Sequence, residues 1–514
     1  MLYTIIRKND LEDLQLSGND GVTENHKNTK NAHSVALRVG CSVVVLFVVT
    51  AACTMLIMGG NHLTSSEVKL SSTCKTAFDC DFSGRPRKIQ TKGGLVVADH
   101  GVCSEIGAQA LDDGGHAVDA AVATAICQGV INSFASGLGG GDFLMIREAN
   151  GSSLFINARE QAASAATADM YVGKDSYAAL DGGLAVAIPL QLKGLELAWS
   201  RYGKLPWSSL VVPSIKLAED GFRMHPYLHY ILSGPFTLRR IQNNTLLREV
   251  YLIHETDGSW RIPNVGEWCC RKPTLARSLR RISKLGAAWL YSPRQSKLMA
   301  AEIQSSGGIL TETDLRSSFP TVHRPMSKKI GDFEFIFPPP PSSGAAVVLA
   351  MDILAGFPNT TSRMLTQHWL VESMKHIYAV RTSMGDPGTP EHPFRNMSEL
   401  LSDMMDSEFS KRLRESVHDD RVLDASEYGG QWNPECLGGS LDVKEDHGTS
   451  HMSIVDAEGN AVSMTMTINT AFGSAVVSES TGIIFNNEMD DFNTKGPTGS
   501  HLLPGGSITC GDRS

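Results

Sequence analysis

The stretch His447-Gly-Thr-Ser-His-Met-Ser-Ile-Val-Asp-Ala-Glu-Gly-Asn-Ala-Val-Ser-Met-Thr-Met-Thr467 decides the fold of this chain. Apolar and polar residues alternate on both sides of a turn at 456–460, which is the pattern of an antiparallel β-hairpin. The numbers of paired residues in such a hairpin have a constant sum. A turn centred near residue 458 makes that sum 916. Thr467 is therefore predicted to lie opposite Thr449, with Asn469 two residues further on the same face.

The Gly448-Thr449 junction is a candidate for self-cleavage and for amide chemistry. A threonine freed at a chain end carries its own nucleophile and its own base, an α-amine with a pKa near 8. Gly448 tolerates the unusual backbone that attack on the preceding carbonyl needs. The alternative is purely structural, because threonine is common in strands and cross-strand threonine pairs stabilise sheets.

Two other segments carry candidate binding residues. The segment Phe485-Asn-Asn-Glu-Met-Asp-Asp-Phe492 could be a solvated loop, a calcium loop or a pocket for an ammonium group. The spacing of a calcium loop is absent, and the flanking phenylalanines indicate partial burial, which favours a binding role. Arg159 follows a predicted strand, where pockets form in layered folds, although a surface arginine is the simpler alternative.

The composition is that of a large globular protein. Of the 514 residues, 42% are hydrophobic and 20% are charged, and the net charge is −9. This length allows a large core, and the mildly acidic balance gives no reason to expect a nucleic-acid partner.

Residues 39–60 form an uncharged stretch, long enough for a helix to cross a bilayer core of about 30 Å. The alternative is a cleaved signal peptide, whose apolar core is usually shorter and closer to the start. We expect a single-pass, type II plasma-membrane protein. Residues 1–38 would then be a cytoplasmic tail, 39–60 the transmembrane anchor and 61–92 a stalk, with the rest of the chain extracellular.

An extracellular location implies oxidising conditions. The eight cysteines outside residues 39–60 show no zinc-site spacing. Cys103 and Cys127 lie near the outer ends of two helical patterns within 98–127, so a disulfide between them is geometrically possible, and the sequence leaves the pairing open. Four glycosylation sequons agree with an exterior location, at Asn150, Asn243, Asn359 and Asn396.

The remaining patterns favour a layered α/β architecture. Strands are predicted over 143–147, 154–157 and 333–337, and helices over 190–202, 208–220, 274–285, 345–356 and 367–383. The run Ser136-Gly-Leu-Gly-Gly-Gly-Asp142 lacks the ending of a phosphate-binding loop. We interpret it as backbone that must pass close to another part of the molecule.

Together these motifs resemble the gamma-glutamyltransferases (gamma-glutamyl transpeptidases) of the N-terminal-nucleophile hydrolase superfamily, from about residue 93 to residue 505. The resemblance rests on these stretches: Cys103-Ser-Glu-Ile-Gly, Asp112-x-Gly-Gly-x-Ala-Val-Asp-Ala-Ala, Gly137-x-Gly-Gly-Gly, Ile156-Asn-Ala-Arg-Glu, Pro338-Pro-Pro-Pro-x-Ser-Gly, Tyr378-Ala-x-Arg-Thr-x-x-Gly-Asp-Pro387, Gly448-Thr-Ser-His and Gly482-Ile-Ile-Phe-Asn-Asn-Glu-Met-Asp-Asp-Phe492.

The resemblance implies a four-layer αββα fold and self-cleavage before Thr449. The products would be a large subunit, 93–448, and a small one, 449–514, that stay together. Thr449 would take the γ-glutamyl group from glutathione or its conjugates and pass it to water, an amino acid or a dipeptide. The implied supporting roles use no cofactor and no metal. Thr467 would orient Thr449, Arg159 would pair with the substrate α-carboxylate, Glu488, Asn469 and Asp491 would hold the α-ammonium, and Cys103 and Cys127 would form a family disulfide.

One departure from the family pattern concerns the C-terminus. The family's small subunit continues beyond the position of Pro504-Gly505 and supplies a Ser-Ser pair for the α-carboxylate and a Gly-Gly for the oxyanion hole. We therefore expect this sequence to be C-terminally incomplete, and one lost oxyanion donor typically costs about 10²–10³ in rate. A second hypothesis follows, a truncated and catalytically weak or inactive membrane-anchored relative that acts as a binding protein. A third is a relative specialised for another γ-glutamyl compound, such as a leukotriene conjugate.

Overall fold

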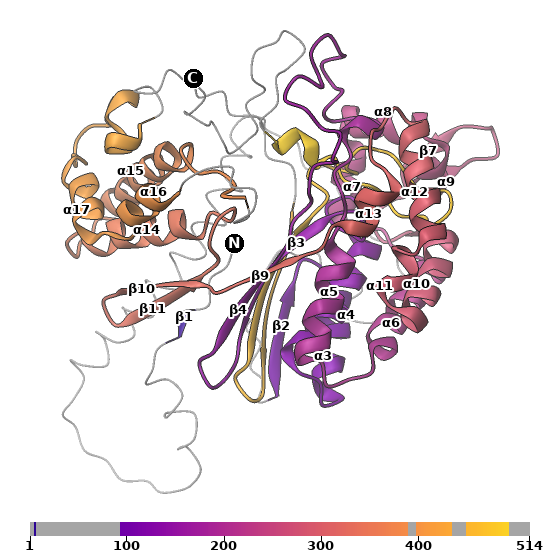
Figure 1. Ribbon diagram of the computed structural model, residues 1–514, viewed down its shortest axis with the longest axis horizontal. Helices are drawn as coiled ribbons and strands as arrows, with labels where there is room; N and C mark the ends of the chain where they lie inside the picture. Colours follow the sequence, from indigo (N-terminus) through magenta and orange to yellow (C-terminus); the bar gives the residue numbers. More distant parts are fainter. Residues whose placement is uncertain (1–4, 7–92, 389–396, 434–448, 493–514) are drawn as a thin grey trace, which may run out of the picture. The chain divides into compact units, whose positions relative to one another are not determined.

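A computed structural model describes residues 5–6, 93–388, 397–433 and 449–492 (Figure 1). Its main sheet has six strands in the order β2-β12-β13-β3-β4-β9, and every neighbouring pair is antiparallel. The strands are β2 (Gly94–Ala98), β12 (Ser450–Asp456), β13 (Ala461–Thr467), β3 (Gly141–Arg147), β4 (Ser153–Ala158) and β9 (Thr321–His323).

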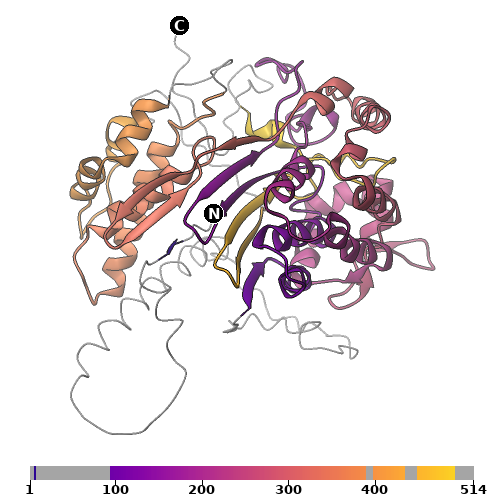
Figure 2. The ribbon, with the colours of Figure 1, turned by 60° about the horizontal axis from the view of Figure 1, so that its bottom comes forward.

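The hairpin of β12 and β13 has the predicted register. Ser450 pairs with Met466 and Ile454 pairs with Val462, so the paired numbers sum to 916. Figure 2 shows this golden hairpin beside the purple strands β3 and β4. The turn is held by the Asp456 side chain, whose Oδ1 accepts from the N–H of Asn460 at 2.9 Å. Because this tight turn and the alternating pattern agree, only one register buries the apolar face.

Helices α3 (Gly101–Asp112) and α4 (Ala117–Ile131) follow β2 and lie where the sequence predicts two helical patterns. Almost every side chain of α4 is buried, and α4 packs on β12 and β13. Small alanine side chains allow this close approach of helix to sheet. The hairpin turn also fixes the helix start, because Asp456 Oδ2 accepts from the N–H of Ala117 at 3.0 Å. A disulfide with an S–S distance of 2.02 Å joins α3 to α4 through Cys103 and Cys127.

Among the other helices between β4 and β9, three agree within a residue with the predicted segments 190–202, 208–220 and 274–285, namely α5, α6 and α10, and the rest were not individually predicted. Helix α5 packs on β3 and β4, and α6 packs against α4 and α10. Their bounds are α5 (Gln191–Tyr202), α6 (Trp207–Asp220), α7 (Pro226–Ser233), α8 (Pro235–Asn243), α9 (Thr245–Tyr251), α10 (Pro273–Leu285), α11 (Ala287–Leu290), α12 (Pro293–Ser305) and α13 (Glu312–Ser317). Two small two-stranded sheets pair β5 (Phe222–Arg223) with β8 (Trp268–Cys269), and β6 (Ile253–His254) with β7 (Trp260–Arg261).

A second sheet has the order β1-β11-β10 and packs against α14. Its strands are β1 (Ile5–Ile6), β11 (Phe333–Phe337) and β10 (Met326–Ile330), and its helices are α14 (Gly344–Ala355), α15 (Arg363–Arg381), α16 (Ser398–Met405) and α17 (Ser407–Glu415). The proline run after Phe337 connects β11 to α14, and it is stiff because each proline ring fixes φ.

Several expectations fall outside the described residues. The tail 1–38 apart from residues 5–6, the anchor 39–60 and the stalk 61–92 are not described, nor are Gly448, Asn396 and the chain from 493 onward. Within the part that is described, no helix combines the length and the apolar character needed to cross a membrane.

Candidate functional site

Thr449 lies at the open end of the hairpin, one residue before β12, and is exposed. Extending the register by one pair sets it opposite Thr467, the last residue of β13. Thr467 is buried and pairs on its other side with Gly141 of β3. Its hydroxyl oxygen accepts a hydrogen bond of 2.8 Å from the N–H of Asn469. The hydrogen bond from Asn469 thus fixes the orientation of the Thr467 hydroxyl, and Thr467 lies opposite Thr449 in the extended hairpin register.

The glycine run 139–141 lets β3 approach its neighbours without side chains. A β-carbon on Gly139 would overlap the carbonyl oxygen of Ile484, and one on Gly140 would overlap that of Thr467. The predicted interpretation of this run as closely approaching backbone is confirmed. Glycine is required here by space, because no larger residue fits between the two carbonyl groups.

Two adjacent asparagines attach the acidic segment to its neighbours, and one of them, Asn486, contacts the glycine run. The Nδ2 of Asn486 donates to the carbonyl oxygens of Gly139 at 2.7 Å and Ala187 at 2.9 Å. The side-chain oxygen of Asn487 accepts from the N–H of Thr470 at 3.1 Å. Both asparagine side chains are fully buried. The segment is therefore an ordered inner wall, which confirms the predicted burial between Phe485 and Phe492.

Asn469 links the hairpin to that wall. Its Nδ2 donates to the carbonyl oxygen of Asn487 at 3.0 Å, and its φ is +71°. The sequence predicted Asn469 on the same strand face as Thr467, by alternation. The structure differs, because β13 ends at Thr467 and the chain then turns through a left-handed residue, a conformation that asparagine tolerates. The side-chain nitrogen of Asn469 is therefore already used in the hydrogen bond to the carbonyl oxygen of Asn487.

Arg159 is surrounded by three carboxylates. It directly follows β4, and its Nη2 donates to Asp491 Oδ2 at 2.8 Å. The same guanidinium contacts Glu488, and its Nη1 lies 3.5 Å from Glu160 Oε2. Glu488 and Asp491 come from a 3-10 turn at Glu488–Asp491. Three of the four substrate-binding candidates therefore meet directly, and the fourth, Asn469, contacts the residue before Glu488.

The electrostatics of this cluster are dominated by burial. Burial raises the pKa of Glu160 to about 7, and it raises the pKa of Glu488 well above its ordinary range, with Glu160 adding to the effect. Burial and the charge of Glu160 likewise raise the pKa of Asp142, whose carboxylate oxygens have no hydrogen-bond partner among the described residues. Arg159 is the counter-charge. Burial by itself lowers its pKa, but the charges of Glu488, Glu160 and Asp491 raise the pKa above its ordinary value. One guanidinium cannot balance so many charges, so protons are retained within the cluster near neutral pH.

Sequence reasoning overlooked several of these residues. Glu160 and Asp142 carried no separate signal, because their importance comes from burial beside Arg159. A hydroxyl network beside Thr449 was also overlooked. Ser136 Oγ donates to Ser450 Oγ at 3.1 Å, and Asp99 Oδ2 accepts from the N–H of His451 at 3.3 Å. Burial raises the pKa of Asp99, although its hydrogen bonds with Ser450 and His451 lower it.

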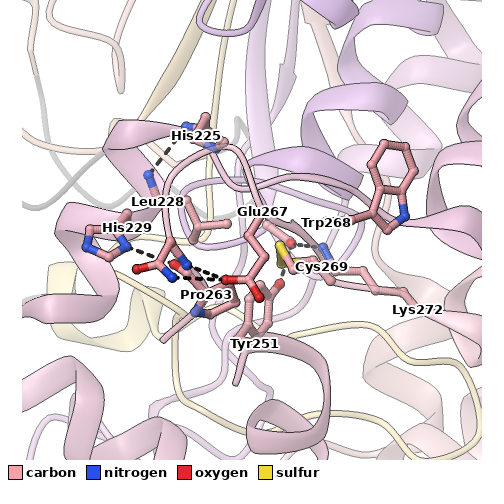
Figure 3. Close-up of a disulfide and its surroundings, with 12 residues drawn as sticks. His225, Leu228, His229, Tyr251, Pro263, Glu267, Trp268, Cys269 and Lys272 are labelled. Carbon is pink, nitrogen blue, oxygen red and sulfur yellow. Dashed lines mark hydrogen bonds between the residues drawn. A yellow bond between two sulfur atoms is a disulfide. The ribbon is translucent and has the colours of Figure 1, made fainter. Parts of the chain in front are cut away.

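The cysteines and sequons lie as follows. Besides Cys103–Cys127, the adjacent residues Cys269 and Cys270 form a disulfide, whose surroundings Figure 3 shows. Asn150, Asn243 and Asn359 are exposed, which is compatible with their use as glycosylation acceptors.

The arrangement is a mixed α/β fold in which a threonine-bearing hairpin is linked through Asn469 to a cluster of Arg159 with three carboxylates. A family model described as Gamma-glutamyltranspeptidase matches residues 103–507. The chain therefore belongs to the gamma-glutamyltranspeptidase family.

Individual relatives agree. "Glutathione hydrolase 2" of Arabidopsis thaliana is 40% identical over 404 residues, which are 78% of this chain and 66% of that relative. "Glutathione hydrolase proenzyme 1" of Schizosaccharomyces pombe is 34% identical over 420 residues, 79% of this chain and 62% of that relative. The structure of Helicobacter pylori gamma-Glutamyltranspeptidase superposes with a TM-score of 0.60 at 26% identity, covering 67% of this chain and 98% of that chain. The chain thus spans slightly less than two thirds of the length of these two relatives.

Proposed function

We propose that this protein transfers or hydrolyses the γ-glutamyl group of glutathione and its conjugates through an acyl-enzyme on Thr449, after self-cleavage at the Gly448-Thr449 bond. The hydroxyl of Thr449 attacks the carbonyl of residue 448, and the N–C bond between the two residues breaks. Breaking that bond frees the α-amine of Thr449 and leaves its side-chain oxygen in an ester. Water then hydrolyses the ester, which gives a carboxylate on residue 448 and the free Thr449 hydroxyl. That amine then serves as base for the same hydroxyl in turnover.

The observation that carries the proposal is the chain of contacts from the hairpin to the acidic pocket. Thr467, opposite Thr449, accepts from the N–H of Asn469, and Asn469 donates to Asn487. The next residue, Glu488, contacts Arg159. A γ-glutamyl donor has a reactive amide at one end and an amino-acid head group at the other. The contact chain supports a site that receives both ends.

The pocket suits a zwitterionic head group. The α-carboxylate pairs with Arg159, whose planar fork matches a carboxylate. The α-ammonium takes the place that the guanidinium now has beside Glu488 and Asp491, and the side-chain oxygen of Asn469 completes its partners. Because the ligand supplies one charge of each sign, it enters the buried cluster without changing its net charge, which limits the desolvation cost.

The names of the relatives support the enzyme over a binding-only relative. Both curated relatives are called glutathione hydrolases, and one is called a proenzyme, which agrees with activation by cleavage. We also propose the finer four-layer αββα fold, and a type II plasma-membrane location with the anchor at 39–60. The exposed sequons Asn150, Asn243 and Asn359 support the extracellular side.

The direct test is expression of the chain and of its Thr449→Ala variant. We expect the parent chain to give two fragments on a reducing gel, with the smaller one beginning at Thr449 by N-terminal sequencing. The parent should release a chromogen from a γ-glutamyl anilide. Thr449→Ala should give one uncut chain and no release. If the parent chain is active but uncut, the proposal that activity requires self-cleavage is wrong. If the parent chain is cut but releases no chromogen, the proposal that this chain turns over γ-glutamyl donors is wrong.

A further inference from the structure

A cavity of about 440 Å³ lies among the end of α4, the end of α9, the start of α10 and the segment 477–484. Its volume is within the range of small-molecule pockets. Most of its lining is apolar, including Ile126, Val130, Leu247, Leu275, Leu279 and Ile483.

A buried lysine forms part of the cavity wall. Lys272 is 6% exposed, and its Nζ donates to Ser133 Oγ at 2.6 Å and to the carbonyl oxygen of Val130. Ser133 Oγ is in turn 2.6 Å from the hydroxyl of Tyr251. The ammonium also lies 5.1 Å from the centre of the Tyr251 ring. Figure 3 shows Tyr251 and Lys272 close to Cys269. All three polar side chains line the cavity.

Two other buried cations each have a carboxylate partner, whereas Lys272 has none among the described residues. Buried Lys328 is 2.6 Å from Asp352, and buried Arg240 is paired with Asp181. Within the described parts of the chain, no carboxylate forms an ion pair with Lys272. The other charged residues that line the cavity, Glu249, Glu479 and Arg271, are exposed, so Lys272 is its buried cation. Burial lowers the pKa of Lys272 to about 7, which is the expected response of an ammonium without a counter-charge.

We propose that this cavity binds a small organic monocarboxylate with an apolar body. The carboxylate pairs with Lys272 and accepts from the hydroxyls of Ser133 and Tyr251, and the apolar body contacts the aliphatic lining. A single negative charge matches the single buried cation. A dianion such as phosphate would leave one charge unbalanced in a medium of low dielectric constant, which is costly.

The experiment is calorimetric titration of the purified full chain with decanoate, below its micelle concentration, at about pH 6 and about pH 8.5, on either side of the pKa of Lys272. Decylammonium and decanol serve as probes with the same tail and a different head group. We expect decanoate to bind more tightly than both, and more tightly at the lower pH, where Lys272 is protonated. Binding of the carboxylate should also take up protons at intermediate pH.

Two variants locate the site. Lys272→Met keeps the length of the side chain and should weaken decanoate binding by about 10-fold or more, as for the loss of a charge-assisted hydrogen bond. Lys193→Met is the matched control. Lys193 is also partly buried and donates from Nζ to backbone carbonyls, and it does not line the cavity. This variant should bind as the parent does.

Equal binding of decanoate and decylammonium by the parent would overturn the proposal, as would absence of decanoate binding or unchanged binding by Lys272→Met. If Lys272→Met fails to fold, the head-group and pH comparisons on the parent still decide the matter. None of these measurements depends on Thr449 or on turnover, so a failure here is distinct from a failure of the proposed enzymatic function.

Discussion

Arg159 and Asp491 are separated by 332 residues and are joined by a hydrogen bond of 2.8 Å. Their contact crosses the Gly448-Thr449 bond, since one residue precedes it and the other follows. The main sheet also joins the two sides of this bond. Strands β12 and β13 follow the bond in the chain, and they lie between β2 and β3, which precede it. If this bond is cleaved, the hydrogen bonds of the main sheet and the contact between Arg159 and Asp491 would hold the two products together.

We expect a lysine at position 159 to bind the γ-glutamyl donor more weakly than the native arginine does. Arg159→Lys keeps the charge but loses the planar fork that contacts several carboxylates. We expect kcat/KM for a γ-glutamyl donor to fall by about 10- to 100-fold, mainly through a higher KM, while self-cleavage continues. Steady-state kinetics and a reducing gel measure the two effects. Loss of cleavage with an unchanged KM would contradict the assignment.

We expect the Thr467 hydroxyl to orient the hydroxyl of Thr449, the proposed nucleophile. Thr467→Val keeps the shape and removes one hydrogen-bonding group. Self-cleavage and turnover should both slow by about 10- to 100-fold, the cost of one hydrogen bond that orients a reacting group. The control is Thr465→Val, on the same strand, whose hydroxyl lies 2.8 Å from His451 Nδ1. Equal rates for Thr467→Val and the parent would remove Thr467 from the mechanism.

The close approach at Gly140 predicts a large loss of stability. In Gly140→Ala, the new methyl group would overlap the carbonyl oxygen of Thr467 and force β13 away from β3. We expect a destabilisation of about 2–4 kcal/mol, seen as a lower Tm, together with slower self-cleavage. Gly93→Ala is the control, because a β-carbon there meets no atom within 4 Å. Similar Tm values for the two variants would contradict the packing argument.

The raised pKa values of Glu160 and Glu488 predict a pH dependence of donor binding. A carboxyl group whose pKa is raised keeps its proton to higher pH, whereas an ammonium ligand favours the ionised form. Binding should therefore release protons, and affinity should fall as the pH drops through about 7, the pKa of Glu160.

Titration of L-glutamate in two buffers with different ionisation enthalpies measures this proton release. Glu160→Gln removes one titrating group and should flatten the pH dependence of affinity near neutral pH. Proton uptake on binding, or a pH profile that Glu160→Gln leaves unchanged, would show that these carboxyls do not face the ammonium.

The sequence by itself determined the local elements. The register of β12 and β13, the break between α3 and α4 and the close backbone at Gly139 and Gly140 could all be predicted. Alternation, turn residues and glycine runs act between neighbours in the chain, so their effects can be read locally. The three-residue strand β9 was not predicted, because so short a strand has no readable period.

Only the tertiary structure decided the electrostatics. Arg159 could be expected to meet Glu488 and Asp491 only through family resemblance, and the roles of Glu160 and Asp142 were not visible at all. The environment of Lys272 could not be predicted either, because nothing in the sequence indicates that Lys272 is buried beside Ser133 and Tyr251. The pKa of a group depends on its burial and on charges brought near by distant parts of the chain. Those quantities exist only after β3, β4, α4, α10 and the segment 485–492 have packed together.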